Sequence, residues 1–150
     1  MDEAYSYACG LLYHVGSRQV LLHHRDANAP TNPNTWALIG GGREPEDGGD
    51  PVLTWMREVE EEIGVVLERD LIRFLADYLK PGTRRRRCVF YYEWPSLDTE
   101  FVIGEGDGVG WVTVEEALAL PDVTAGTKQD LVTFVSELNV SVVPSGAAVS

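Results

Sequence analysis

The first two apolar segments of the chain have the length and residue types of β-strands. They span residues 4–15 and 19–25, and the second contains the uninterrupted apolar run Val20-Leu21-Leu22 that is typical of a buried strand. Gly16-Ser17 between them is a turn-forming pair, so a β-hairpin is expected. Residues 26–34, with two Pro and three Asn, predict a loop that leads to a short strand at residues 36–39.

The middle of the chain changes to helical periodicity. Asp50-Pro51 has the residue types of a helix N-cap followed by Pro at the first helical position, and Gly64 tolerates the left-handed conformation of a C-cap. Between them, apolar residues recur at helical spacing and form one stripe, which comprises Val52, Trp55, Met56, Val59 and Ile63. One helix that packs through this stripe is expected.

The second half of the chain returns to strand patterns and ends in a second helix. Strands are predicted at residues 71–79, 88–94 and 109–113, and a short segment at 114–120 follows the last of them. Residues 127–138 predict a helix whose spacing favours core packing through Leu131, Phe134, Val135 and Leu138. One domain over residues 1–140 and a flexible C-terminal tail over 141–150 are therefore expected.

The central helix also carries an acidic cluster. Glu58, Glu61 and Glu62 fall within an arc of about 100°, separate from the apolar stripe. Like charges one turn apart repel by about 0.2–0.5 kcal/mol per pair, and a divalent cation removes this repulsion. Carboxylates without Cys or His suit Mg²⁺, Mn²⁺ or Ca²⁺ rather than zinc. A solvated acidic face is the alternative, but the preceding glycine-rich loop, which can approach a phosphate or a metal, favours the cation.

Composition limits the classes of partner. The 150 residues have a net charge of −12, which argues against binding polymeric nucleic acid. The first ten residues do not resemble a signal peptide, and no apolar stretch approaches the ~20 residues of a membrane span. A soluble, cytoplasmic protein without a membrane partner is expected. Cys9 and Cys88 are interpreted as two thiols in or near the core, without a functional role.

The segment from Arg57 to Val65, REVEEEIGV, resembles the core of the Nudix box, REUxEExGU with U a bulky aliphatic residue, at every fixed position. Upstream, the family pattern places a Gly, five residues, a Glu and seven residues before the Arg. Two alignments are open. Gly41 and Asp47 fit if Asp replaces the usual Glu and Gly48-Gly49 is a two-residue insertion, whereas counting back from the helix puts Gly49 at the Glu position.

The resemblance implies the α/β Nudix fold, a mixed β-sheet sandwiched between α-helices (α/β/α), over residues 5–138. Two further local patterns are similar to those of family members. The segment 21–26, LLHHRD, followed by Trp36 resembles the approach to the glycines. Gly104-Glu105-Gly106 resembles the loop in which an acidic residue outside the box supplies another metal ligand. Glu105 is the candidate and Asp107 the next; an exposed turn carboxylate is an equal alternative.

The activity that the resemblance implies is hydrolysis of a diphosphate bond in a nucleoside diphosphate linked to another group. Mg²⁺, with Mn²⁺ as the alternative, is the implied cofactor. Its ligands would be carboxylates of the helix and the loop and a glycine carbonyl, namely Glu58, Glu61, Glu62, Glu105 and either Gly40 or Gly41. Arg57 would pair with the box carboxylates and hold their orientation. Glu58 is the candidate general base, with Glu105 as the alternative.

Candidate substrate contacts are Arg25, at a strand end near the glycines, with Trp36, Gly41 and Arg84. Trp36 and the strand residues Tyr7, Tyr91 and Tyr92 have core packing as the favoured interpretation. Lys80 and Arg84 to Arg87 place five of the twelve Lys and Arg within eight residues, as a loop that either steers an anionic substrate or keeps a hairpin soluble. Nucleoside triphosphates, canonical or oxidised, nucleotide sugars and dinucleoside polyphosphates all remain as substrates.

Two other classes are compared with the enzyme. A nucleotide-binding regulatory Nudix-like module without turnover is the main alternative, although such modules usually have a degraded catalytic helix and this helix is intact. A calcium-binding structural protein is disfavoured because the acidic loop of an EF-hand is absent. The number of metal ions and the oligomeric state, with a homodimer as one alternative, stay open.

Overall fold

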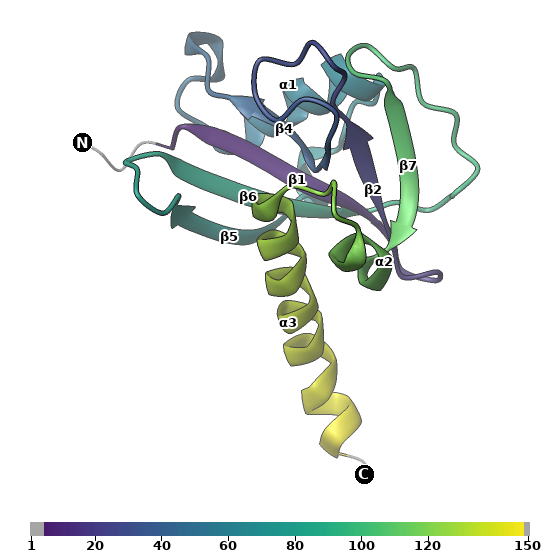
Figure 1. Ribbon diagram of the computed structural model, residues 1–150. Helices are drawn as coiled ribbons and strands as arrows, with labels where there is room; N and C mark the ends of the chain where they lie inside the picture. Colours follow the sequence, from purple (N-terminus) through teal and green to yellow (C-terminus); the bar gives the residue numbers. More distant parts are fainter. Residues whose placement is uncertain (1–4, 149–150) are drawn as a thin grey trace.

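A computed structural model describes residues 5–148 of the chain, with side chains described for residues 5–138 (Figure 1). Four strands precede the first helices, three strands follow these, and two helices end the described chain. The strands are β1 (Tyr7–His14), β2 (Gln19–His24), β3 (Trp36–Ala37), β4 (Ile39–Gly42), β5 (Arg73–Leu79), β6 (Arg86–Glu93) and β7 (Gly108–Thr113). The helices are η1 (Pro45–Asp47), α1 (Pro51–Ile63), η2 (Arg69–Leu71), α2 (Val114–Ala119) and α3 (Ala125–Ala148).

The strands form one mixed, seven-stranded sheet. Its main path runs β3-β2-β1-β6-β5, while β4 pairs with β1 and β7 pairs with β2. The β1–β2 pair is antiparallel, with Tyr13 opposite Val20, which confirms the predicted hairpin. The central β1–β6 pair is parallel, with Cys9 opposite Val89, so residues far apart in sequence lie side by side.

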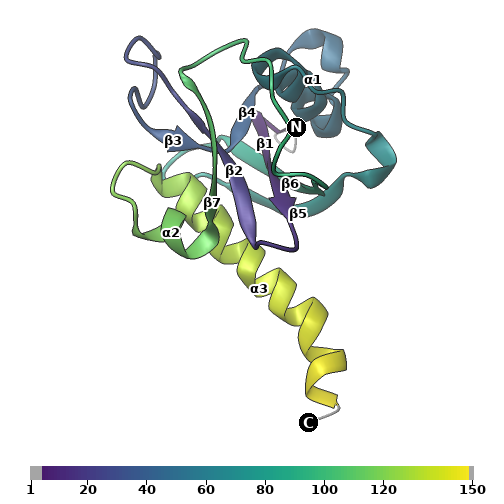
Figure 2. The same cartoon turned by 90° about the vertical axis from the view of Figure 1, so that its right-hand side faces the viewer.

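Each face of the sheet is covered by a helix, and each interface is a separate apolar core (Figures 1 and 2). Alternate residues of β1 divide between the two cores because successive side chains of a strand point to opposite faces. Cys9 and Leu11 pack toward α3 with Phe134, whereas Ala8 and Leu12 belong to the core of α1. This arrangement confirms the predicted mixed sheet between helices.

The ends of α1 agree with the sequence prediction. The Asp50 side chain accepts a hydrogen bond from the Val52 N–H at 3.0 Å, and Pro51 is the first helical residue. Gly64 ends the helix at φ 74°, with its N–H donating to the Glu60 carbonyl. Trp55 is fully buried, and its indole N–H donates to the Ile39 carbonyl at 3.0 Å. This bond fixes α1 against β4, which carries the glycines.

The predicted strand at 36–39 is two strands. Leu38 lies between β3 and β4, and its N–H donates to the Thr127 hydroxyl of α3 instead of to a neighbouring strand. Strand β4 pairs with β1, which places Gly40 opposite Cys9 and Gly41 opposite Ala8. The sheet therefore brings the glycines to the edge that faces α1.

Other boundaries shift by a few residues. The first strand begins at Tyr7, and the part of the prediction that falls on residue 4 lies outside the described residues. Helix η1 was not predicted, and α3 continues from Ala125 to Ala148, past the expected end at residue 138. The flexibility of residues 141–150 stays a prediction; 149 and 150 lie outside the described residues. Within the described residues, no helix is long and apolar enough to cross a membrane.

Candidate active site

The glycines of β4 and the acidic face of α1 meet at a cavity of about 590 Å³. One wall contains Gly40, Gly41, Glu58 and Glu62. Other lining residues come from the end of β2, the loop after it, the β5–β6 hairpin, the loop before β7 and the segment at the start of α3. They include His23, Arg25, Thr31, Asn32, Lys80, Arg85, Arg86, Arg87, Glu105 and Thr127. Residues from both sides of the sheet thus line one cavity.

Glu58 and Glu62 are the two acidic residues of α1 that the cavity wall contains, and both are buried. They lie one helical turn apart, and their side chains hydrogen-bond to each other. Burial, followed by the proximity of Glu58, raises the pKa of Glu62 to about 10. A side chain on Gly41 would overlap the Glu58 carboxylate, so glycine is required for β4 to pass this close. The pair is an acidic site that favours a bound proton or cation.

Arg57 forms a network of polar contacts behind these carboxylates. Its Nε and Nη2 atoms donate to the two oxygens of Asp47 at 3.2 and 3.1 Å, and Nη1 donates to Glu58 at 2.9 Å. Nη2 also donates to the Gly42 carbonyl at 3.0 Å. Arg57 therefore connects the glycine strand, the loop before the helix and the acidic face.

The surroundings of Asp47 bear on the two alignments that the sequence left open. It is buried and accepts hydrogen bonds from the Thr54 hydroxyl at 2.6 Å and the Glu44 N–H at 2.9 Å, in addition to Arg57. The Arg57 guanidinium and these donors lower the pKa of Asp47 to about 2. Gly49 has a left-handed φ of 78° with open space around it. These contacts favour the alignment in which Asp47 replaces the box Glu and Gly48-Gly49 is an insertion, because Asp47 pairs with Arg57 and Gly49 has no side chain that could do so.

The remaining predicted acidic residues lie farther out. The Glu61 side chain is 47% exposed and 3.5 Å from Arg57 Nη1, and Glu61 does not line the cavity. Glu105 lines the cavity from the exposed loop before β7, and its charge contributes to the raised pKa of Glu62. Asp107 pairs instead with His24 at 3.1 Å. Among the described residues, no three acidic, His or Cys side chains converge on one point.

The predicted substrate contacts divide in the same way. Arg25 lines the cavity and is held by the Thr31 carbonyl at 2.8 Å, whereas Trp36 packs against His24 and Arg84 does not line the cavity. Other basic residues take the position expected for Arg84. They lie on the β5–β6 hairpin and are Lys80, Arg85, Arg86 and Arg87. The cavity has an acidic wall and a basic wall.

The domain profile that matches this chain is the NUDIX domain, over residues 6–132. The chain belongs to the Nudix family. The matched residues include the intact box helix, and the protein is a Nudix hydrolase.

Solved structures of Nudix proteins have the same fold. A MutT protein from Methanosarcina mazei Go1 superposes with a TM-score of 0.70 at 20% identity, over 89% of this chain and 94% of the other. A MutT NUDIX hydrolase from Burkholderia pseudomallei gives 0.59 at 24% identity, over 85% and 95%. The NUDIX domain of Shewanella oneidensis NrtR, complexed with ADP ribose, gives 0.66 at 19% identity, over 89% and 88%. No curated protein matches the chain.

His23 and Asp130 of this Nudix domain were not singled out from the sequence. His23 is buried at the cavity and contacts Glu62 and the Glu105 backbone. Asp130 of α3 is fully buried and pairs with Arg87, a cavity residue, at 2.6 Å. A polar residue inside the apolar stripe of a strand or helix is the only sequence signal for either.

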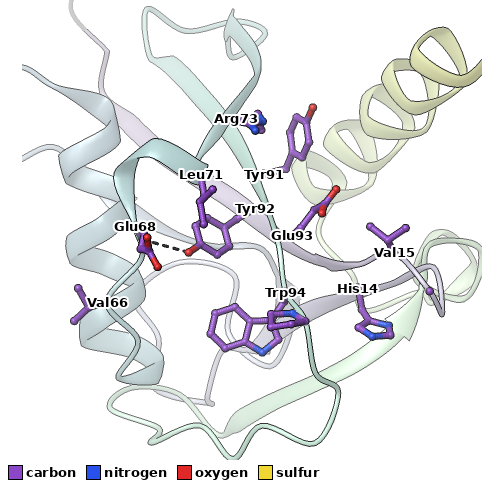
Figure 3. A pocket seen from close by; sticks show the side chains of 12 residues that line it. His14, Val15, Val66, Glu68, Leu71, Arg73, Tyr91, Tyr92, Glu93 and Trp94 are labelled. Atoms are coloured by element: carbon purple, nitrogen blue, oxygen red, sulfur yellow. Dashed lines mark hydrogen bonds between the residues drawn. The ribbon is translucent and has the colours of Figure 1, made fainter.

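A larger cavity, of about 790 Å³, is lined by residues outside the Nudix box (Figure 3). The ends of β1 and β6 and the segment after α1 line it, with Tyr92, Trp94 and Leu71 among its side chains. The Tyr92 hydroxyl accepts a hydrogen bond from the Glu68 N–H at 3.3 Å. Its two carboxylates, Glu68 and Glu93, are both exposed, so it lacks the buried acidic pair. The cavity of about 590 Å³ that is lined by Glu58 and Glu62 is therefore the candidate active site.

Proposed function

We propose that this protein is a divalent-metal-dependent hydrolase that cleaves a diphosphate bond in a nucleoside diphosphate linked to another group. The buried Glu58–Glu62 pair, together with the basic residues that line the same cavity, is the observation that supports this proposal. A diphosphate needs charge neutralisation and an activated water to be hydrolysed. One wall offers ligands for a cation and the other offers positive charge for phosphate.

The donor set fits magnesium. Mg²⁺ usually binds one or two carboxylates together with water and substrate phosphates, rather than a complete cage of protein ligands. Glu58 and Glu62 would hold it, with a carbonyl of Gly40 or Gly41 and with Glu61 and Glu105 at the rim. When bound, the cation would neutralise phosphate charge and lower the pKa of water. Mn²⁺ suits the same oxygen ligands.

The side chains of this chain would divide the remaining tasks. Glu58 is the proposed general base, with Glu105 as the alternative, because both line the cavity and accept a proton when ionised. Arg57 would keep Glu58 oriented through its 2.9 Å hydrogen bond. Arg25 and the hairpin residues Lys80 and Arg85 would bind phosphate oxygens.

The substrate class is a small nucleotide derivative. The bound ADP ribose of the Shewanella oneidensis NUDIX domain is a nucleoside diphosphate linked to a sugar, which is one member of this class. Nucleoside triphosphates and dinucleoside polyphosphates carry more negative charge, and the basic wall favours these. Trp36 and Arg84 stay candidates for contacts outside the cavity.

The test is a panel of nucleotide diphosphate derivatives incubated with the purified protein and Mg²⁺ or Mn²⁺. Mass spectrometry of the products identifies the bond that breaks, and reactions in EDTA measure metal dependence. Hydrolysis that requires metal supports the proposal. Tight binding of a nucleotide without hydrolysis would instead favour the nucleotide-binding module, and activity in EDTA would contradict the metal site.

A further inference from the structure

His23, on β2, contacts two different elements of the candidate site. Its side chain is 7% exposed, and its Nδ1 atom lies 3.3 Å from Oε1 of Glu62 on α1. Its Nε2 atom lies 2.7 Å from the backbone oxygen of Glu105. A carbonyl oxygen only accepts hydrogen bonds, so Nε2 is the donor in this contact. Both ring nitrogens are therefore used by protein groups.

The loop that carries Glu105 is attached to the same two elements. The Val102 and Gly104 N–H groups donate to the carbonyls of Ile63 and Glu62 at 3.2 and 2.9 Å, and so satisfy the free end of α1. At the other end, the Asp107 N–H donates to the His24 carbonyl at 3.0 Å. His23 contacts the loop between these two attachments.

Two glycines allow this close approach. Gly106 has a left-handed φ of 78°, and a side chain there would overlap the His24 carbonyl and the His23 ring. A side chain on Gly104 would overlap the Glu61 carbonyl. The backbone of the loop therefore lies directly against α1 and His23.

We propose that His23 is a positioning residue that sets the Glu62 carboxylate at a fixed place relative to the Glu105 loop. The inference rests on the proposed metal-dependent function, because it assigns to His23 the geometry of that cation site. His23 is not itself a metal ligand, because both of its ring nitrogens already contact protein groups. Without it, Glu62 would lose the contact that limits its rotamers, and the loop would lose its central attachment.

Two conservative substitutions separate these contacts. The side-chain amide of Asn can place a donor or an acceptor at the position of Nδ1 of histidine, and the amide nitrogen of Gln can replace the Nε2 donor. His23→Asn should thus retain the contact with Glu62 and lose the loop, whereas His23→Gln should retain the loop and lose Glu62. His14→Gln is the matched control, because His14 lies at the far end of β1 and bonds to Ser17.

The first measurement is the dissociation constant for Mn²⁺, by calorimetry on the metal-free protein, with melting temperature as a check of folding. We expect His23→Gln to bind Mn²⁺ about 10- to 100-fold more weakly, which is typical for loss of a contact behind a metal ligand. His23→Asn should bind Mn²⁺ with an affinity within a few-fold of that of the wild type, because it retains the contact with Glu62. Equal affinity of wild type and His23→Gln would overturn the inference while leaving the proposed function intact.

The second measurement is amide hydrogen exchange over residues 102–107. We expect faster exchange in His23→Asn than in His23→Gln or the His14→Gln control, because only the first releases the Glu105 carbonyl. If His23→Gln does not fold, this measurement decides alone: unchanged exchange in a folded His23→Asn overturns the inference. Failure of the wild-type protein to bind Mn²⁺ would overturn both the inference and the proposed metal site.

Discussion

At the scale of single residues, the burial of Glu58 and Glu62 determines how readily their carboxyl groups ionise. Two neighbouring carboxylates in a site of low polarity cannot both stay ionised without a compensating charge, which is why the pKa of Glu62 is raised. A cation bound at this pair would compete with protons for the same carboxylate oxygens. The buried pair therefore differs from the exposed Glu61 of the same helix, and substitution of the pair should have the larger effect.

We predict that Glu58→Gln and Glu62→Gln each lower kcat by about 100-fold without loss of the fold, because Gln keeps the size but removes the ligand charge. Glu61→Gln should have a smaller effect, since its side chain lies at the rim. Glu60→Gln is the matched control, an exposed Glu on the same helix. Steady-state kinetics with circular dichroism decide, and wild-type rates for Glu58→Gln and Glu62→Gln would contradict the site.

Asp47 gives a prediction about pH. Its pKa in the folded protein, about 2, lies below its ordinary value of 3.8, so its ionised form stabilises the fold. This stabilisation is complete above about pH 5 and is lost as pH falls through 3.8 toward 2. At pH 7, Asp47→Asn should lower the free energy of unfolding by about 1–3 kcal/mol, because it weakens the contacts to Arg57.

The measurement is urea denaturation of wild type and Asp47→Asn at pH 7, 5 and 3. The difference between them should be similar at pH 7 and 5 and should shrink at pH 3. Asp98→Asn, an exposed Asp in a loop, is the control and should match wild type throughout. A difference that grows on acidification would mean that the ionised form of Asp47 does not stabilise the fold.

The identity of the site residues could be predicted better than their geometry. The spacing of Glu58 and Glu62 on one helix gives their common face, because helix periodicity is local. The role of Asp47 could not be predicted, since two alignments fit the same letters and only its buried pairing with Arg57 distinguishes them. His23 contacts residues 39 and 82 positions away, and no local pattern encodes such a contact.

At the scale of elements, local sequence patterns predicted α1 and its caps. They did not predict features that depend on a contact with a residue far away in the sequence. The strand at 36–39 is interrupted because the Leu38 N–H donates a hydrogen bond to the Thr127 hydroxyl, 89 residues away. The parallel pairing of β1 with β6 depends on a connection of many residues and has no local sequence signature. The basic hairpin between β5 and β6 was predicted, but which of its side chains turn into the cavity was not.

The hairpin gives the element-scale prediction. If its cavity residues bind the phosphates, replacing both Lys80 and Arg85 with Ser should raise KM about tenfold at low salt with little change in kcat. The effect should shrink toward 1 M salt, where the screening length is about 3 Å. Arg73→Ser is the control, because Arg73 is an exposed residue of β5 that lines the other cavity and not this one. Steady-state kinetics at two ionic strengths decide, and an unchanged KM for the double variant at low salt would exclude a substrate role for the hairpin.

At the scale of the whole molecule, the cavity connects the two faces of the sheet. The acidic pair comes from α1, whereas Arg87 is held from the opposite side by Asp130 of α3, which accepts from its Nε and Nη2 atoms at 3.0 and 2.6 Å. Asp130 also accepts from the Tyr78 hydroxyl at 2.9 Å, so one buried carboxylate joins α3 to β5 and β6. The helix that covers the far face therefore fixes part of the basic wall.

We predict that Asp130→Asn lowers the free energy of unfolding by about 3–5 kcal/mol, because it removes the buried carboxylate that compensates the charge of Arg87, whose side chain is only 19% exposed. The folded fraction should also show a raised KM, since Arg87 lines the cavity and loses the group that orients it. Urea denaturation and steady-state kinetics of the same samples test both effects. Asp122→Asn, exposed just before α3, is the control. Loss of stability with an unchanged KM would show that Asp130 holds α3 to the sheet without acting on the cavity.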